Sequence, residues 1–276
     1  MEPDTPRITD GVHIAIFDLD GTLYQGDGFV PRYLEELHQR GSTSSGTLRG
    51  ELDAILAGSH PLELGDFYAP GDDVILRAPD FTVEAAFRWD GTPVDHERVG
   101  TPIRYGDDVV YAGDAWQVVR ALACHFQVAS GLQDEAFAAV RHAINEATSD
   151  LLDTTDLAPV LAEVPRFPVR YVMTNTPEHL GRQLVHTLGL PAHFDGIHFG
   201  ANKPAGLESW LAELTRIHDV TADAVLCIGD NYFNDILPAV RAGCRSIWVD
   251  PFGRAPHRGP EVRVSGLADV APLLRA

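Results

Sequence analysis

The chain has 276 residues, 45% of them hydrophobic and 22% charged, so it can bury a core without disulfides and is longer than one small domain needs. Its 40 acidic residues outnumber its 21 basic residues, and the formal charge of −19 argues against nucleic acid or an anionic membrane surface as a partner. The three cysteines show no CxxC spacing, the first ten residues are acidic and polar, and no apolar run is long enough to span a membrane. We therefore expect a cytoplasmic protein.

A short apolar run at residues 12–17 is typical of a buried strand in a parallel sheet. Helical stretches separate four similar runs late in the chain. In one of these stretches Thr176 is expected as the N-cap, with Pro177 at the first helical position and Gly189 after the end. The four late strands are predicted at Val169–Met173, Gly196–Phe199, Ala224–Ile228 and Ser246–Val249. This alternation predicts an α/β fold with a doubly wound, parallel, Rossmann-like sheet.

The middle of the chain breaks this alternation. Phe81 to Trp89 alternate in polarity like a half-buried strand, and Asp90-Gly91 reads as the turn of a hairpin. Helices are predicted at residues 30–40, 47–57, 114–126 and 133–147, and a helix ending at Gly243 is expected to begin at about Asn234. We therefore predict a catalytic core from residues 1–26 and 166–276, with a mixed helix and β-ribbon cap inserted as residues 27–165.

Two carboxylates follow the first predicted strand, in the segment Asp18-Leu19-Asp20-Gly21-Thr22. At this edge of a doubly wound sheet, side chains point into the crevice where such folds bind ligands. Like charges this close repel each other unless a cation lies between them, and oxygen ligands suit Mg²⁺. The alternative is a solvated acidic turn.

Polar residues also follow the second and fourth predicted strands. Asp230 and Asp235 would complete a carboxylate cage if their strand lies beside the first one, although Asn234 or Asp235 could instead cap the next helix. Thr174 and Asn175 offer a hydroxyl and an amide before a helix N-terminus, which suits a phosphate or a simple cap. Lys203 is the only lysine of the chain and is not part of a P-loop motif.

Taken in order, these segments resemble the four motifs of the haloacid dehalogenase superfamily of phosphatases and phosphotransferases that use an aspartate nucleophile. The resemblance covers residues 12–26 and 166–250. The long interval between the first and second motifs implies a cap inserted there, and residues 24–28, with two glycines, would be the flexible segment that carries it.

The resemblance implies a role for each motif residue. Asp18 would be the nucleophile, and Asp20 would protonate the leaving group and then activate water. Lys203 would pair with Asp18 and with the phosphoryl oxygens. Phosphate would be bound by Leu19, Thr174, Asn175 and Lys203, and Mg²⁺ by Asp18, the Asp20 carbonyl and Asp230, with Asp235 and Asn234 ordering the waters around the ion.

The function implied is a Mg²⁺-dependent phosphomonoester hydrolase that acts on a small phosphorylated metabolite, such as a sugar phosphate or a nucleoside monophosphate. Dehalogenases of the superfamily lack a carboxylate at the position of Asp20, so a carbon–halogen substrate is disfavoured. Two alternatives stay open: a phosphomutase of the β-phosphoglucomutase type, which shares all four motifs, and a catalytically silent metabolite-binding protein on the same fold.

Overall fold

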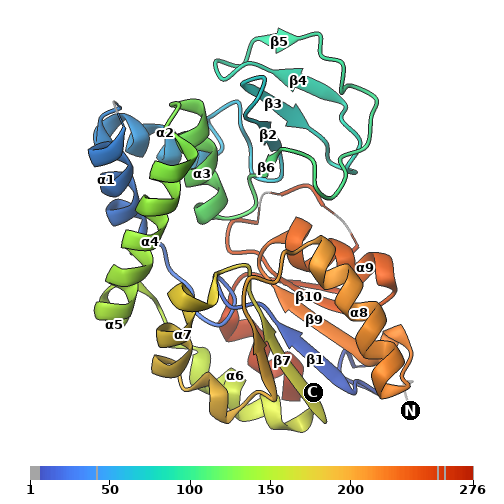
Figure 1. Cartoon of the computed structure of the whole chain (residues 1–276). Helices are drawn as coiled ribbons and strands as arrows, with labels where there is room; N and C mark the ends of the chain where they lie inside the picture. The colour runs from blue at the N-terminus through green and yellow to red at the C-terminus, as the bar shows by residue number, and fades with distance from the viewer. Residues whose placement is uncertain (1–6, 42, 254, 258, 276) are drawn as a thin grey trace. The chain divides into compact units, whose positions relative to one another are not determined.

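The computed structural model describes residues 7–41, 43–253, 255–257 and 259–275, so most of the polar N-terminal stretch lies outside the described residues. Contacts divide the chain into two units (Figure 1). The core unit comprises the chain up to Gly26, Leu152–Pro251 and the part from Gly259 onward, and the cap unit comprises Asp27–Leu151 with the segment Phe252–Arg258. The cap unit thus begins at the predicted residue.

The cap unit ends earlier than the sequence analysis placed it, at Leu151 instead of residue 165. The difference arises from α6 (Leu157–Glu163), which contacts the C-terminal helix α10 (Val270–Arg275) of the core unit. An ion pair between Arg275 and Glu163, with 2.7 Å between Nε and Oε1, joins the two helices. No local sequence pattern indicates a contact between segments so far apart in the chain, so this boundary could not be predicted from the sequence.

The core unit is built on a six-stranded parallel sheet in the order β11-β10-β9-β1-β7-β8, which confirms the predicted α/β class. β1 lies between β7 and β9, so the carboxyl ends of these three strands meet at one edge of the sheet. The strands are β1 (Ile14–Phe17), β7 (Val169–Met173), β8 (Gly196–His198), β9 (Val225–Gly229), β10 (Arg245–Val249) and β11 (Val262–Val264). The first five correspond to the predicted strands, whereas β11 is an edge strand that the sequence analysis did not identify.

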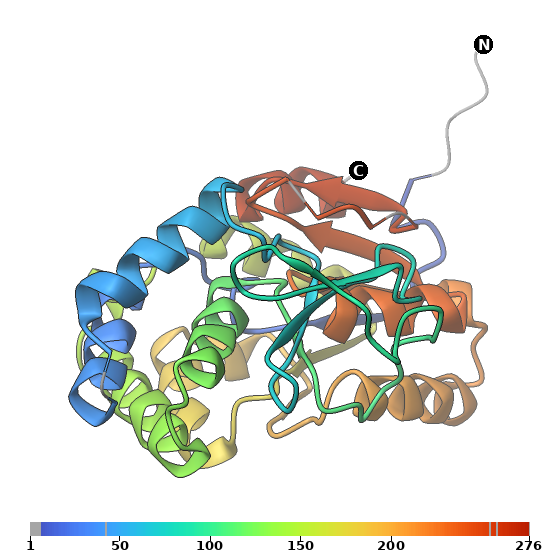
Figure 2. The same ribbon diagram turned by 90° about the horizontal axis from the view of Figure 1, so that it is seen from above.

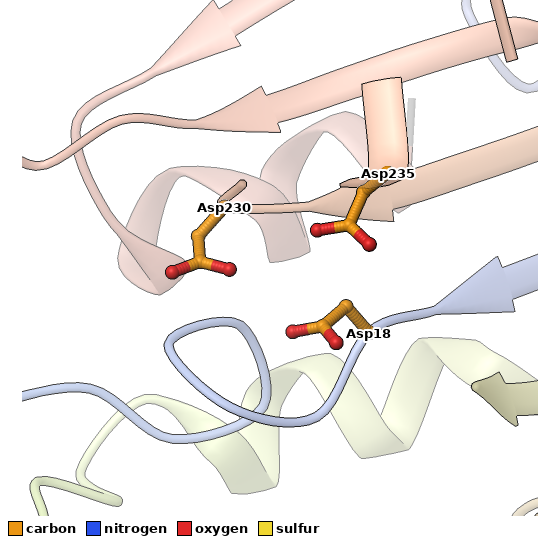
Figure 3. A group of neighbouring side chains, drawn as sticks. All are labelled: Asp18, Asp230 and Asp235. Atoms are coloured by element: carbon orange, nitrogen blue, oxygen red, sulfur yellow. The ribbon is translucent and has the colours of Figure 1, made fainter. Parts of the chain in front are cut away.

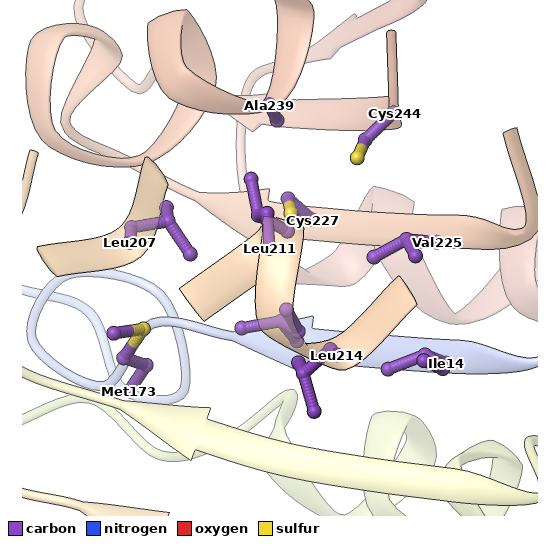
Figure 4. Packing of buried hydrophobic residues seen from close by; sticks show 10 residues of the cluster. Ile14, Met173, Leu207, Leu211, Leu214, Val225, Cys227, Ala239 and Cys244 are labelled. Atoms are coloured by element: carbon purple, nitrogen blue, oxygen red, sulfur yellow. The ribbon is translucent and has the colours of Figure 1, made fainter. Parts of the chain in front are cut away.

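Helices cover both faces of this sheet. α8 (Ala205–His218) and α9 (Leu237–Ala242) bury Leu207, Leu211 and Ala239 against the strand residues Ile14 and Val225 (Figure 4). α6 and α7 (Glu178–Thr187) lie on the other side (Figure 1). Short 3₁₀ turns complete the unit at Val164–Arg166 (η1), Leu190–Ala192 (η2), Ala222–Ala224 (η3) and Leu267–Asp269 (η5).

Two helix starts differ from the prediction. The N-cap of α7 is Pro177, without a side-chain bond, because the Thr176 hydroxyl instead donates to Oδ2 of Asp20 at 2.9 Å. Before α9 the chain forms a π-helix, η4 (Tyr232–Ile236), which Asn231 caps by accepting the Asn234 N–H at 3.0 Å. The expected cap Thr176 is therefore wrong, and the alternative in which Asn234 or Asp235 caps the next helix does not hold. Gly243 does end α9 in the left-handed conformation.

The cap unit joins a helical bundle to a small antiparallel sheet (Figures 1 and 2). The helices are α1 (Val30–Arg40), α2 (Ser45–Ala57), α3 (Ala115–His125), α4 (Ser130–Glu146) and α5 (Thr148–Leu151). The strands, in the sheet order β5-β4-β3-β2-β6, are β2 (Phe67–Ala69), β3 (Val74–Arg77), β4 (Ala85–Phe87), β5 (Pro93–Val94) and β6 (Val110–Tyr111). In the described part of the chain, no helix combines the length and the apolar character that a bilayer crossing requires.

The predicted β-ribbon is present in a shorter form. β4 covers only Ala85–Phe87 of the alternating segment. The segment's first residue, Phe81, has a left-handed φ of 60°, and the backbone of Val83 bonds with Gly100 and Thr101 instead of a strand of the sheet. The turn at Asp90-Gly91 is confirmed, since it connects the antiparallel pair β4 and β5. His257, from the later part of the chain, belongs to this unit as well, and its Nδ1–H donates to the Pro79 carbonyl at 2.9 Å.

Candidate active site

Asp18 is the first residue after β1, at the sheet edge where β7 and β9 also end. Its side chain is buried, and Oδ1 accepts a hydrogen bond from Lys203 Nζ at 2.6 Å. The other oxygen, Oδ2, is buried and has no hydrogen-bond partner among the described residues. A buried carboxylate oxygen without a donor is costly unless a ligand or an ion completes its coordination.

Lys203 joins two carboxylates and is itself held through its backbone. Its Nζ also donates to Oδ1 of Asp235 at 2.6 Å. The Asn175 side chain accepts the Lys203 N–H at 2.7 Å through Oδ1 and donates to the Lys203 carbonyl at 3.1 Å through Nδ2. The side-chain amide of Asn175 therefore positions the lysine. The predicted contact of Asn175 with phosphate would then be made by its backbone N–H.

Three carboxylates converge in front of the sheet edge (Figure 3). Asp18, Asp230 and Asp235 each offer one oxygen, and these oxygens all lie within 4.8 Å of one another. Asp230 is further held by Trp248, whose Nε1 donates to its carbonyl at 2.8 Å. A Cβ on Gly21 would lie 2.0 Å from Oδ2 of Asp230, so the loop after β1 approaches this carboxylate as only a glycine allows. A compact set of carboxylate oxygens is the donor set that Mg²⁺ prefers.

Burial and charge shift the pKa values of this cluster in opposite directions. Burial raises the pKa of Asp18 to about 7, against the lowering effect of Lys203. The pKa of Asp235 is raised by burial as well, and Lys203 again opposes the shift. Burial lowers the pKa of Lys203, but the charges of Asp18 and Asp235 outweigh it, so its pKa is raised and the ammonium stays protonated.

The carboxylate of Asp20 lies in a different environment, among hydroxyl groups. Tyr24 donates to Oδ1 at 2.5 Å, and Thr174 and Thr176 donate to Oδ2 at 2.8 and 2.9 Å. Tyr24 and Thr176 are not predicted from the sequence as partners of Asp20. In the sequence, the only indication of these contacts is closeness to motif residues, since Tyr24 lies four positions after Asp20 and Thr176 lies two positions after Thr174.

Two further predicted residues take positions beside the cluster. Asn234 is in the π-helix, where its N–H donates to Asn231, and Leu19 has a fully buried side chain and a carbonyl that accepts the Leu23 N–H at 3.0 Å. The structure therefore brings Asp18, Lys203, Asp230 and Asp235 together. The roles predicted for Leu19 and Asn234 stay predictions.

Comparison with known proteins gives the family. A sequence profile described as haloacid dehalogenase-like hydrolase matches residues 12–243. Among curated protein sequences, no match to this chain is found.

Solved structures share the fold across nearly the whole chain. The magnesium-bound HAD hydrolase YfnB of Bacillus subtilis is 17% identical with a TM-score of 0.54, over 96% of this chain and 99% of that one. A Thermotoga maritima protein assigned as a β-phosphoglucomutase is 15% identical with a TM-score of 0.51, over the same 96% and 99%. An L-2-haloacid dehalogenase is also 15% identical with a TM-score of 0.51 and the same coverage. At these identities the likeness concerns the fold and leaves the reaction open.

Proposed function

This chain belongs to the haloacid dehalogenase-like hydrolase family, and from that premise we propose that it is a Mg²⁺-dependent phosphomonoester hydrolase. Its substrate would be a small phosphorylated metabolite, such as a sugar phosphate or a nucleoside monophosphate. One observation carries the proposal: two carboxylates on one loop have different partners, because Asp18 is paired with an ammonium whereas Asp20 accepts hydrogen bonds from hydroxyls. Such a pair suits a nucleophile beside a group that gives and takes a proton.

The donor set fits a divalent cation. Asp18, Asp230 and Asp235 supply oxygens within 4.8 Å of one another, and the buried Oδ2 of Asp18 has no hydrogen-bond donor among the described residues. We assign Asp18, Asp230 and the Asp20 carbonyl to the ion, with Asp235 and Asn234 ordering the waters around it. Bound there, Mg²⁺ would neutralise phosphate charge, which a protein with a formal charge of −19 otherwise repels.

The residues of the chain then divide the reaction between them. Asp18 attacks phosphorus and forms an aspartyl phosphate while the ester P–O bond breaks and Asp20 protonates the leaving oxygen. Water next attacks phosphorus, Asp20 takes its proton, and Asp18 is released. Lys203 and the Thr174 hydroxyl, with the backbone N–H groups of Leu19 and Asn175, bind the phosphoryl oxygens.

The presence of Asp20 favours phosphate esters over haloacids. An alkoxide leaving group needs a proton, whereas a halide leaves without one. The structural likeness to a dehalogenase does not oppose this, because it concerns the fold. The proposal includes a cytoplasmic location, which the three free cysteines support.

The test is phosphate release from a panel of sugar phosphates, nucleoside monophosphates and p-nitrophenyl phosphate, with and without Mg²⁺, and halide release from 2-chloropropionate. We expect Mg²⁺-dependent phosphate release, no halide release, and no activity in Asp18→Asn. Asp195→Asn is the matched control, because this exposed carboxylate pairs with Arg170 away from the cluster. Absence of phosphate release from every ester overturns the proposal, and isomerisation of the same sugar phosphates would then identify a phosphomutase.

A further inference from the structure

Two hydroxyl groups outside the family motifs bind the carboxyl group of Asp20. Tyr24 donates to Oδ1 at 2.5 Å and Thr176 donates to Oδ2 at 2.9 Å, while Thr174 completes the set at 2.8 Å. Tyr24 and Thr176 are 1% and 6% exposed. Their hydroxyls therefore contact Asp20 from within the fold, away from free exchange with solvent.

The segment that carries Tyr24 is fixed immediately after the tyrosine. The backbones of Gln25 and Asp153 exchange two hydrogen bonds, at 2.8 and 2.7 Å between N and O. The Gln25 side chain also accepts the Leu267 N–H at 2.9 Å. The phenol of Tyr24 is therefore anchored on a backbone that is tied to two other segments of the core unit.

Thr176 is fixed in a comparable way on the other side of Asp20. Its N–H donates to Oγ1 of Thr174 at 3.0 Å, and its carbonyl accepts the Gly200 N–H at 3.0 Å. The Thr176 hydroxyl donates to Asp20 and not to the start of α7, so the N-cap position of that helix, Pro177, is without a side-chain hydrogen bond. The two anchored hydroxyls hold both oxygens of one carboxyl group.

The chemical type of these partners matches a group that exchanges a proton. An ammonium can only donate, so Lys203 favours an ionised Asp18. A hydroxyl donates or accepts after a rotation of its O–H bond, so Tyr24 and Thr176 can hold Asp20 at the same place before and after it transfers a proton. The two neighbouring aspartates thus have different partners: Asp18 has one that can only donate a hydrogen bond, whereas Asp20 has partners that can donate or accept one.

We propose that Tyr24 and Thr176 are positioning residues that fix the Asp20 carboxyl group for proton transfer, an inference that rests on the proposed phosphoryl transfer. When the ester P–O bond breaks and the bond from Asp18 to phosphorus forms, the Asp20 proton moves to the leaving oxygen. When water attacks, a new O–P bond forms, the bond to Asp18 breaks, and one proton of the water returns to Asp20. Tyr24 and Thr176 gain and lose no proton overall.

The test compares two esters that differ in their need for a proton. Phosphorylation of Asp18 is measured by rapid quench with propyl phosphate and with p-nitrophenyl phosphate, in the wild type and in Tyr24→Phe, Thr176→Val and the double variant. We expect each single variant to slow phosphorylation by the alkyl ester about tenfold, since proton transfer depends on position. The aryl ester should react within about threefold of the wild type, because p-nitrophenolate leaves without a proton. KM should be unchanged for both esters.

Two variants separate positioning from folding. Tyr68→Phe is the matched control, because Tyr68 is also 1% exposed and donates to a carboxylate, Asp73 Oδ1, at 2.6 Å, but lies in the cap unit. We expect it to keep the wild-type ratio of the two rates. Thr176→Ser keeps the hydroxyl and should restore most of the alkyl-ester rate that Thr176→Val loses.

The outcomes distinguish this inference from the proposed function. Equal losses with both esters, no loss at all, or failure of Thr176→Ser to restore the rate would overturn the positioning role while the hydrolase stands. If the wild type forms no phosphorylated Asp18 with either ester, the proposed function fails and the positioning role fails with it.

Discussion

Lys203 Nζ lies 2.6 Å from Oδ1 of Asp18, although 185 positions separate the two residues in the sequence. The side chains are only 3% and 8% exposed, so neither charge has water as an alternative partner. Asp235 contacts the same ammonium at 2.6 Å. One positive charge therefore compensates two buried carboxylates, and the stability of the metal-free core unit depends on that charge.

Replacing Lys203 by Met should destabilise the metal-free protein by roughly 3–5 kcal/mol, because it leaves two buried carboxylates without a counter-charge. The measurement is the thermal unfolding midpoint with and without Mg²⁺, and the cation should stabilise Lys203→Met more than the wild type. Arg182→Met is the control, since Arg182 pairs with Glu178 on an exposed helix surface and its loss should cost less than about 1 kcal/mol. Equal unfolding midpoints for the metal-free wild type and Lys203→Met would show that the stability of the core unit does not depend on the Lys203 charge.

Binding of Mg²⁺ should weaken as the pH falls from 8 to 6. Burial raises the pKa of Asp18 to about 7, so the metal-free protein carries a proton there at pH 6 and has lost it at pH 8. The cation needs the ionised carboxylate and must displace that proton, so its Kd should be about tenfold larger at pH 6. Calorimetric titration in two buffers of different ionisation enthalpy measures both the Kd and the proton released.

The matched control for this titration is Asp195→Asn, which removes a carboxylate from the core unit away from the cluster and should keep the full pH dependence. Asp18→Asn should release no proton from this site. A Kd that is the same at pH 6 and pH 8 in the wild type would contradict the assignment of the proton to Asp18.

Much of this core was predictable because its strands are contiguous apolar runs. β7 matches its predicted bounds, and the strand before Asp230 does lie beside the first strand, which is the condition on which the expected carboxylate cage depended. Short strands are harder to predict from the sequence. β5 and β6 have two residues each, which is too few to show the alternation of polar and apolar residues that indicates a strand. The helix α1, in contrast, begins and ends as predicted because its apolar face repeats over three turns.

The partners of Asp20 show where sequence reasoning ends. A threonine before Pro177 has the composition of a helix cap, and nothing local distinguishes this from a hydroxyl that binds a carboxylate 156 positions away. Tyr24 likewise reads as part of a hinge until its hydroxyl is placed on Asp20. Residue type predicted the motif carboxylates, whereas the contacts of Thr174 and Thr176 with Asp20 follow only from the packing of β1 against β7.

Gly21→Ala should weaken Mg²⁺ binding at least about tenfold, because the added Cβ would lie 2.0 Å from Oδ2 of Asp230 and displace that carboxylate. The Kd for Mg²⁺ and the unfolding midpoint are both measured. Gly11→Ala is the matched control: Gly11 also has a positive φ, of +75° against +89° for Gly21, but nothing lies within 4 Å of its Cβ position. Both variants should lose about 1 kcal/mol from backbone strain, and Gly11→Ala should bind Mg²⁺ like the wild type. Equal Kd values for the two variants would contradict the role of the Gly21 contact.

The cap unit should lose stability in mild acid through His60. The Nδ1 of His60 accepts the Leu62 N–H at 2.9 Å, so its proton is on Nε2, 3.0 Å from Oε2 of Glu51. Burial lowers the pKa of His60 below its usual 6.5, against the raising effect of Glu51. The unfolded chain therefore binds a proton more readily than the folded chain does. Stability is fully present above pH 6.5 and is lost as the pH falls through the lower, folded value.

The measurement is the unfolding midpoint between pH 8 and pH 5 in the wild type and in His60→Asn, whose amide oxygen can still accept the Leu62 N–H but does not titrate. We expect a smaller fall of the midpoint in His60→Asn. We also expect the protection factor of the Leu62 amide in the wild type, which compares its exchange rate with the intrinsic rate at the same pH, to decrease as the pH drops. The control is His142→Asn, at an exposed position on α4, whose unfolding midpoint should fall by as much as that of the wild type. If His60→Asn and the wild type lose the same stability over this range, the acid sensitivity of the cap unit has its source in another group.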